Sequence, residues 1–233
     1  EFRCKTERGK FLWDWAFAGG SLIAAVAQGL MLGTIIQGVR IAGRSYAGGS
    51  FDWLTPFSLL TAAAVVIGYA LLGACWLILK TEGPLQRRAR AFAWPLAIAF
   101  LAGIGLISLW TPFLEANYLQ RWFAWPAILY TAPVPLLTLL AAWRLLLAVA
   151  SGRETEPFLA TLALFVLCYI GLGISLYPNI VPPSLSITEA AGPDDSLAFL
   201  LAGAAVLIPM IVAYTAYSYW VFRGKVDIDR GYH

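Results

Sequence analysis

Residues 54–79 read LTPFSLLTAAAVVIGYALLGACWLIL, an apolar run without a charged side chain. A helix needs about 20 apolar residues to cross the roughly 30 Å hydrocarbon core of a bilayer. Five further runs meet this length, at approximately 13–38, 91–112, 125–150, 157–177 and 197–222. None has the alternating pattern of a barrel strand, and an open strand edge is not tolerated in hydrocarbon. We therefore predict an all-α polytopic transmembrane helix bundle with six spans, forming a single transmembrane domain over residues 1–233.

The composition agrees with this class of protein. Hydrophobic residues make up 60% of the chain and charged residues only 12%, against about 25% charged residues in ordinary soluble domains. The formal net charge is +3. We attribute this charge to membrane topology, and we expect no nucleic-acid partner.

The basic residues are distributed unequally between the two sides of the predicted bundle. Three of the 16 fall on one side: Arg40, Arg44 and Arg121. The other thirteen fall on the opposite side: Arg3, Lys5, Arg8, Lys10, Lys80, Arg87, Arg88, Arg90, Arg144, Arg153, Arg223, Lys225 and Arg230. Because cytoplasmic loops carry the excess of Lys and Arg, we expect both ends of the chain to be cytoplasmic.

Polar side chains within the spans are the default candidates for function in a membrane protein. No Asp, Glu, Lys or Arg lies at the centre of any predicted span. Asp14 lies at the start of the first span, where a carboxylate suits the helix dipole. Gln28 and Gln37 flank a small-residue strip made by Gly29 and Gly33, which would let another helix approach closely. The two glutamines could form interhelical hydrogen bonds or could line a path for water or quinone, and both interpretations stay open here.

The sequence offers almost no ligands for a cofactor. Its single histidine is the last residue, His233. Haem iron takes His, Met, Cys or Tyr ligands. Cys75 falls toward the cytoplasmic end of its span, so the intramembrane candidates are Met31, Met210, Cys168 and scattered tyrosines, without a histidine to complete a usual pair. Structural metal sites need clustered Cys or His, and nucleophile motifs are absent. We expect no catalytic residue, no directly bound cofactor and no metal site in this chain.

Several stretches together resemble a known family. They are 11–21 (FLWDWAFAGGS), 28–38 (QGLMLGTIIQG), 79–83 (LKTEG), 109–112 (LWTP), 177–184 (YPNIVPPS) and 217–226 (YSYWVFRGKV). In their order and spacing they are similar to subunit II of the cytochrome bd-type quinol oxidases. The resemblance runs from end to end, although no single stretch is a catalytic signature.

This resemblance carries several expectations about fold and partner. Subunit II of that family normally has eight spans, so the chain is similar to the last six, without an amino-terminal pair whose acidic motifs are associated with proton uptake. The resemblance implies a partner, subunit I, that holds haem b and haem d, oxidises quinol and reduces O2 to water in aerobic respiration. It also implies a location in the bacterial cytoplasmic (inner) membrane, in contact with lipid, and a structural quinone in an interhelical groove. The chain would supply scaffold rather than haem ligands, and part of a proton path, for which Asp14, Gln28 and Gln37 are the candidate residues.

Two alternatives belong to other classes of protein. A secondary transporter or permease would have inverted repeats with broken helices around a polar site at the membrane midplane. The two Thr-Pro-Phe stretches, at 55–57 and 111–113, are the only repeat we find, and both fall at predicted span ends. A scaffold subunit of some other complex would share the same uncharged interior and would differ only in its partner.

Overall fold

The computed structural model of the chain describes residues 7–43 and 45–225. Arg3, Lys5, Arg44, Arg230 and His233 lie outside this part. Six helices in it are long and apolar enough to cross a membrane, which confirms the predicted all-α class and number of spans. They are α1 (Glu7–Gln37), α2 (Pro56–Lys80), α3 (Gly83–Trp110), α6 (Pro133–Ala150), α7 (Glu156–Leu176) and α9 (Asp194–Val221).

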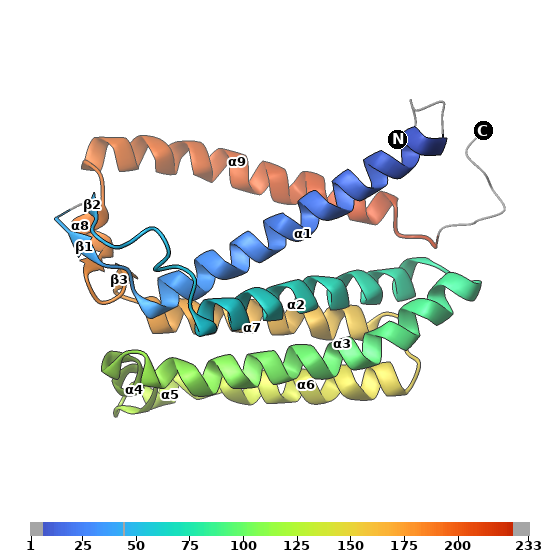
Figure 1. Cartoon of the computed structure of the whole chain (residues 1–233), viewed down its shortest axis with the longest axis horizontal. Helices are drawn as coiled ribbons and strands as arrows, with labels where there is room; N and C mark the ends of the chain where they lie inside the picture. The colour runs from blue at the N-terminus through green and yellow to red at the C-terminus, as the bar shows by residue number, and fades with distance from the viewer. Residues whose placement is uncertain (1–6, 44, 226–233) are drawn as a thin grey trace.

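Short elements connect the long helices. A 3-10 turn (Thr111–Phe113), α4 (Ala116–Phe123) and α5 (Ile128–Thr131) join α3 to α6, and α8 (Ile187–Ala190) precedes α9. Strands β1 (Ile41–Ala42) and β2 (Ser45–Tyr46) pair antiparallel, with Ile41 opposite Tyr46. Strands β3 (Asn179–Val181) and β4 (Leu185–Ser186) also pair antiparallel, with Asn179 opposite Ser186. All four strands lie at the same end of the bundle (Figure 1), which we call the loop end.

The helix boundaries follow local chemistry more than hydropathy. Thr55 caps α2, because its hydroxyl accepts from the Ser58 amide while the Ser58 hydroxyl accepts from the Thr55 amide. Pro56 then occupies the first helical turn, where a missing N–H costs little. In contrast, α3 begins at Gly83 rather than near residue 91, since a helix continues into the aqueous region wherever its backbone hydrogen bonds permit.

Four helices, α2, α3, α6 and α7, pack into a compact bundle (Figure 1). Its centre is a cluster of buried side chains to which each helix contributes: Leu71, Cys75, Ala97, Phe100, Leu145 and Leu164. Small residues allow this close packing. A Cβ at Gly68 of α2 would overlap the rings of Phe100 and Phe165, so α2 accommodates these two aromatic side chains only because residue 68 is glycine.

Helix α1 approaches α2 backbone to backbone along the predicted small-residue strip. A Cβ on Gly29 would overlap the Cα of Ala62, and a Cβ on Gly33 would overlap Thr61 Oγ1 and the Cα of Ser58. This contact lies in the second half of α1. The first half diverges from the bundle toward the N-terminus (Figure 1) and is mostly exposed.

At the loop end, hydrogen bonds connect segments that are far apart in the chain. The Tyr118 hydroxyl donates to the Ile36 carbonyl at 2.7 Å, and Arg121 donates to the Ser175 carbonyl. Burial raises the pKa of Tyr118 to about 12, so this phenol stays a donor. The 177–196 loop lies against the end of α1, where a Cβ at Gly38 would overlap the Pro182 carbonyl.

Helix α9 stands apart from the bundle along its length (Figure 1). No residue of α9 is buried among the described residues, and Phe199 is 84% exposed. The last turn of α9 returns to the end of the bundle where α2 ends, α3 begins and α6 joins α7. We call this the basic end, because it carries Lys80, Arg87, Arg88, Arg90, Arg153, Arg223 and Lys225.

The glycine contact between α1 and α2 gives a direct test of the packing. Replacing Gly33 by Ala should lower the stability of the purified protein by about 1–3 kcal/mol, because the new methyl group meets backbone atoms of α2 that cannot move aside. Gly19→Ala is the matched control on the same helix, since nothing lies within 4 Å of a Cβ at residue 19. Thermal unfolding in one detergent would compare the two variants. Equal melting temperatures for Gly33→Ala and Gly19→Ala would contradict the close approach.

Candidate functional site

The three polar residues singled out from the sequence lie at different heights on α1. Asp14 is exposed in its first half, Gln28 is exposed near its middle, and Gln37 is half-buried at its end. At 1.5 Å per residue, Asp14 and Gln28 are about 21 Å apart along the helix axis, and Gln28 and Gln37 about 13 Å. They make no contact with one another, so a proton path through all three would need water or groups from outside the described residues.

Gln37 belongs to a polar cluster at the loop end. Its Oε1 accepts from Thr55 Oγ1 at 2.5 Å, which ties the last turn of α1 to the cap of α2. The Ser58 hydroxyl of the same cap donates to the Trp53 carbonyl at 2.6 Å. Among the described residues, Gln37 therefore has a clear interhelical partner, as one of its two interpretations required.

Gln28 makes the only mid-span polar contact between α1 and another helix in the described part of the chain. Tyr69 of α2 donates its hydroxyl to Gln28 Oε1 at 3.0 Å. The Tyr69 ring stacks on Phe165 at 5.8 Å, and Phe165 stacks on Phe100 at 5.3 Å. Gln28 and Tyr69 are both exposed. An exposed amide at this depth is costly against lipid, so this pair marks a surface suited to another helix or to water.

Asp14 has no hydrogen bond or ion pair to any described residue. It lies on almost the same face of α1 as Gln28, because 14 residues at 100° each return to within about 40° of the starting direction. Asp14 and Gln28 thus share one exposed stripe, while Gln37 lies on another face and is tied to α2. The structure brings the first two onto a common surface and separates the third from them.

The basic end carries an ion-pair network whose connections the sequence did not indicate. Lys225, just after α9, bonds Glu154 Oε2 at 2.9 Å and Glu82 Oε1 at 3.2 Å. Glu154 in the α6–α7 loop also accepts from Gln86 at 2.9 Å and lies 3.6 Å from Arg90. Lysines and arginines in this region were interpreted only as topology markers. Their partners come from segments far away in the chain, so no local pattern could have revealed them.

These contacts shift the ionisation of the network. Hydrogen bonds from Lys225 and Gln86 hold the pKa of Glu154 below its ordinary value. The same Glu154 contact, followed by that of Glu82, raises the pKa of Lys225. Both groups are therefore charged over the whole neutral range, and the carboxyl end of α9 is held to the bundle by charge.

The described residues offer no cluster of side chains suited to a metal ion. They contain no group of three or more His, Cys, Asp or Glu side chains close enough to hold a metal. Met31 and Met210 are both exposed, and Cys75 is buried with its Sγ 3.6 Å from Thr161 Oγ1. We therefore derive no redox step from these residues.

Comparisons with known proteins identify relatives of the whole chain. A family model described as cytochrome bd terminal oxidase subunit II matches residues 1–222. The chain is 28% identical over 280 aligned positions to cytochrome bd-I ubiquinol oxidase subunit 2 of Escherichia coli K12, covering 100% of this chain and 72% of that protein. It is 27% identical over 239 positions to cytochrome bd ubiquinol oxidase subunit 2 of Bacillus subtilis, covering 97% of this chain and 68% of the relative. Neither of these relatives supports the transporter alternative.

The shifted pKa of Glu154 predicts a pH-dependent contribution to stability. A carboxyl group with a lowered pKa stabilises the fold above its unfolded pKa of about 4.3, and this contribution is lost as the pH falls through the lower folded value. Glu154→Gln should therefore lower the melting temperature at neutral pH, and the difference from the unsubstituted protein should shrink below about pH 4.

A double-mutant cycle isolates the Lys225 contact. The effect of Glu154→Gln should be smaller when Lys225 is already Met, because its main partner is then absent. It should also shrink at high salt, since the pair is exposed to solvent. An effect of Glu154→Gln that is independent of residue 225 would show that the ion pair does not hold the end of α9.

Proposed function

Because the chain belongs to the family of cytochrome bd terminal oxidase subunit II and is a subunit of a membrane quinol oxidase, we propose that it supports a haem-bearing partner without binding haem itself. In this proposal, subunit I carries haem b and haem d, oxidises quinol and reduces O2 to water. The observation that carries this division is the single histidine, His233, which follows the last predicted span by 11 residues in the sequence. Haem iron is commonly held by histidine, and residues 1–232 contain none, which supports haem ligation by the partner.

The surfaces of α1 and α9 suit the supporting role. The first half of α1 and the whole of α9 expose large apolar side chains, including Trp15, Phe17, Phe199 and Leu201. In a membrane, helices associate through packing and polar contacts rather than through exclusion of water. The exposed Gln28–Tyr69 pair supplies such a polar contact. In this proposal, the exposed sides of α1 and α9, together with the Gln28–Tyr69 pair, contact subunit I or the tail of a structural quinone.

The charge distribution supports an orientation. The described basic residues gather at the basic end, and only Arg40 and Arg121 lie at the loop end. Helix α1 begins and helix α9 ends on the side of the basic end (Figure 1). By the positive-inside rule, we propose that the basic end faces the cytoplasm of a bacterium and that the protein spans its inner membrane.

The division of cofactors can be tested on the purified oxidase. The intact complex should show haem b and haem d bands in a reduced-minus-oxidised absorption spectrum, whereas this subunit, separated from its partner, should be colourless. The measurement is a spectrum of each fraction together with a gel of its subunits. Haem bands that stay with the separated chain would refute the proposal.

The proposed proton path rests on Asp14 and Gln28, which share one stripe, and on Gln37. If they carry protons, Asp14→Asn and Gln28→Leu should lower the rate of oxygen consumption per assembled complex while haem content stays constant. Gly20→Ala is the control on the same helix, because Gly20 lies on another face of α1 than Asp14 and nothing lies within 4 Å of a Cβ at residue 20. Gln37→Leu should act mainly on stability, since it removes the partner of Thr55. Unchanged oxygen consumption in all three variants would eliminate the path.

A further inference from the structure

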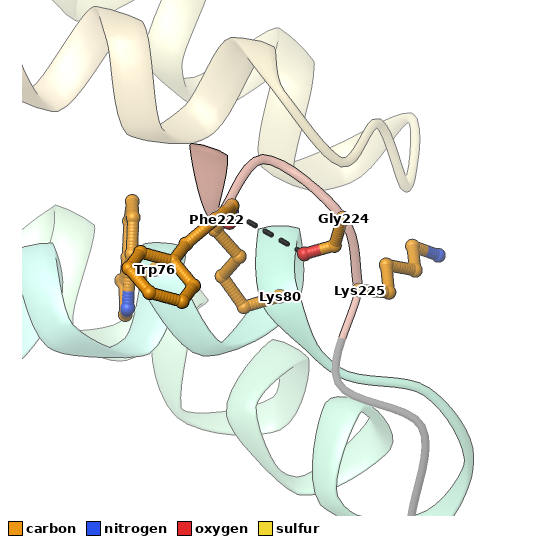
Figure 2. Close-up of a pocket in the computed structure, with 5 residues that line it drawn as sticks. All are labelled: Trp76, Lys80, Phe222, Gly224 and Lys225. Atoms are coloured by element: carbon orange, nitrogen blue, oxygen red, sulfur yellow. Dashed lines mark hydrogen bonds between the residues drawn. The ribbon is translucent and has the colours of Figure 1, made fainter. Parts of the chain in front are cut away.

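A pocket of about 400 Å³ lies at the basic end, between the last turns of α2 and the end of α9. It is lined by Trp76, Lys80, Phe222, Gly224 and Lys225 (Figure 2). Its size is within the range of about 300–1,000 Å³ that small ligands occupy. Lys225 belongs to the ion-pair network, but Lys80 belongs neither to that network nor to the exposed stripe of α1, so the function argued above gives Lys80 no role.

The charge of Lys80 has no acidic partner in the part of the chain that the structure describes. Its ammonium donates to the Phe222 carbonyl at 2.6 Å and to the Gly224 carbonyl at 3.3 Å. It also lies 5.1 Å from the centroid of the Trp76 ring. All three neighbours are uncharged, so they orient the ammonium without neutralising it.

Lys225, the second cation of the pocket, has carboxylate partners, unlike Lys80. Figure 2 shows its side chain turned away from Trp76 and Lys80, and its charge is balanced by Glu154 and Glu82. An anion entering the pocket would therefore meet Lys80 as the uncompensated charge. Arg223 does not line the pocket, and its guanidinium lies 5.1 Å from the Trp220 ring.

The walls of the pocket suit a lipid better than a free ion. Trp76 and Phe222 supply apolar surface beside the ammonium, and the Trp76 ring also meets Tyr219 at 5.6 Å. Tryptophan and tyrosine are typical of the headgroup depth of a membrane. Basic pockets between transmembrane helices on the cytoplasmic side bind anionic headgroups.

We propose that this pocket binds an anionic glycerophospholipid, with Lys80 bonding the phosphate and an acyl chain lying along α2 and α9 beyond Trp76. The lipid would fill space beside α9, which has no buried residue in its described span. It would complete the attachment that Lys80 and Lys225 begin.

A purely structural role for Lys80 makes a different prediction. If Lys80 only caps the carbonyls that end α9, then any side chain that donates a hydrogen bond should replace it. Lys80→Gln keeps a donor and removes the charge, whereas Lys80→Arg keeps both. Arg87→Gln is the matched control, because Arg87 is an exposed cation at the same end and does not line the pocket.

The experiment uses the intact oxidase, purified in mild detergent and titrated with phosphatidylglycerol while native mass spectrometry counts bound lipids. The unsubstituted complex, Lys80→Arg and Arg87→Gln should each retain one phosphatidylglycerol. Lys80→Gln should bind that lipid about fivefold more weakly, the loss expected for one basic contact to an anionic lipid. Phosphatidylcholine should not be retained.

Two further measurements keep the proposal open to refutation if Lys80→Gln fails to assemble. In the unsubstituted complex, a photoreactive phosphatidylglycerol should crosslink to peptides containing Trp76 to Lys80 or Phe222 to Lys225, and crosslinks only elsewhere would overturn the site. Millimolar inorganic phosphate should not displace the lipid, and full displacement would indicate a free-anion site instead. Equal lipid retention by Lys80→Gln and the unsubstituted complex would also refute the proposal.

Discussion

The bundle depends on how closely other helices can approach α2. In hydrocarbon, exclusion of water does not drive helices together, so their association requires close van der Waals packing. Small residues of α2 provide it toward three neighbouring helices, α1, α3 and α7. Ala62 and Thr61 meet Gly29 and Gly33 of α1, Ala64 meets Gly103 of α3, and Gly68 lies under Phe100 and Phe165. Side chains larger than these would separate α2 from its neighbours and remove the contacts that position the remaining helices.

The two ends of the bundle are joined by different kinds of interaction. At the loop end, neutral hydrogen bonds such as Tyr118 to Ile36 and Trp122 to Ser175 link α4 to α1 and α7. At the basic end, the ion pair between Glu154 and Lys225 links the α6–α7 loop to the segment after α9. The first kind depends little on salt or pH, whereas exposed ion pairs depend on both. The attachment of α9 at the basic end is therefore the part of the structure that solution conditions can alter most.

Much of the fold follows from the sequence because a membrane allows few alternatives. Uncharged runs of sufficient length specify helices, and Thr55 followed by Pro56 marks where α2 begins. The predicted span began near residue 91 because residues 83–90 contain arginines, whereas α3 begins at Gly83. Arginines end an apolar run without ending a helix. The partner of Gln28 and the attachment of Lys80 to Phe222 could not be predicted, because they join positions far apart in the chain and no local pattern encodes them. Asp14, Gln28 and Gln37 were chosen as polar residues at the start of the first span and beside its small-residue strip. The helical repeat alone places Asp14 and Gln28 on nearly one face, but the partners of Gln28 and Gln37 on α2 could be identified only in the structure.

Helix α9 shows why polar contacts matter more than apolar ones for placing a helix in this protein. Its apolar surface gains little from lying against α2 rather than against lipid, since both environments are hydrocarbon. Its position is set at its two ends. The β3–β4 and α8 segment leads into its first turn, and after its last turn Lys80 of α2 bonds the Phe222 carbonyl while Lys225 bonds Glu154. A helix held in this way keeps its sides available along the membrane. That arrangement suits a subunit whose work is to cover another chain, because the same apolar faces can contact protein or lipid without any change in the bonds that hold the helix.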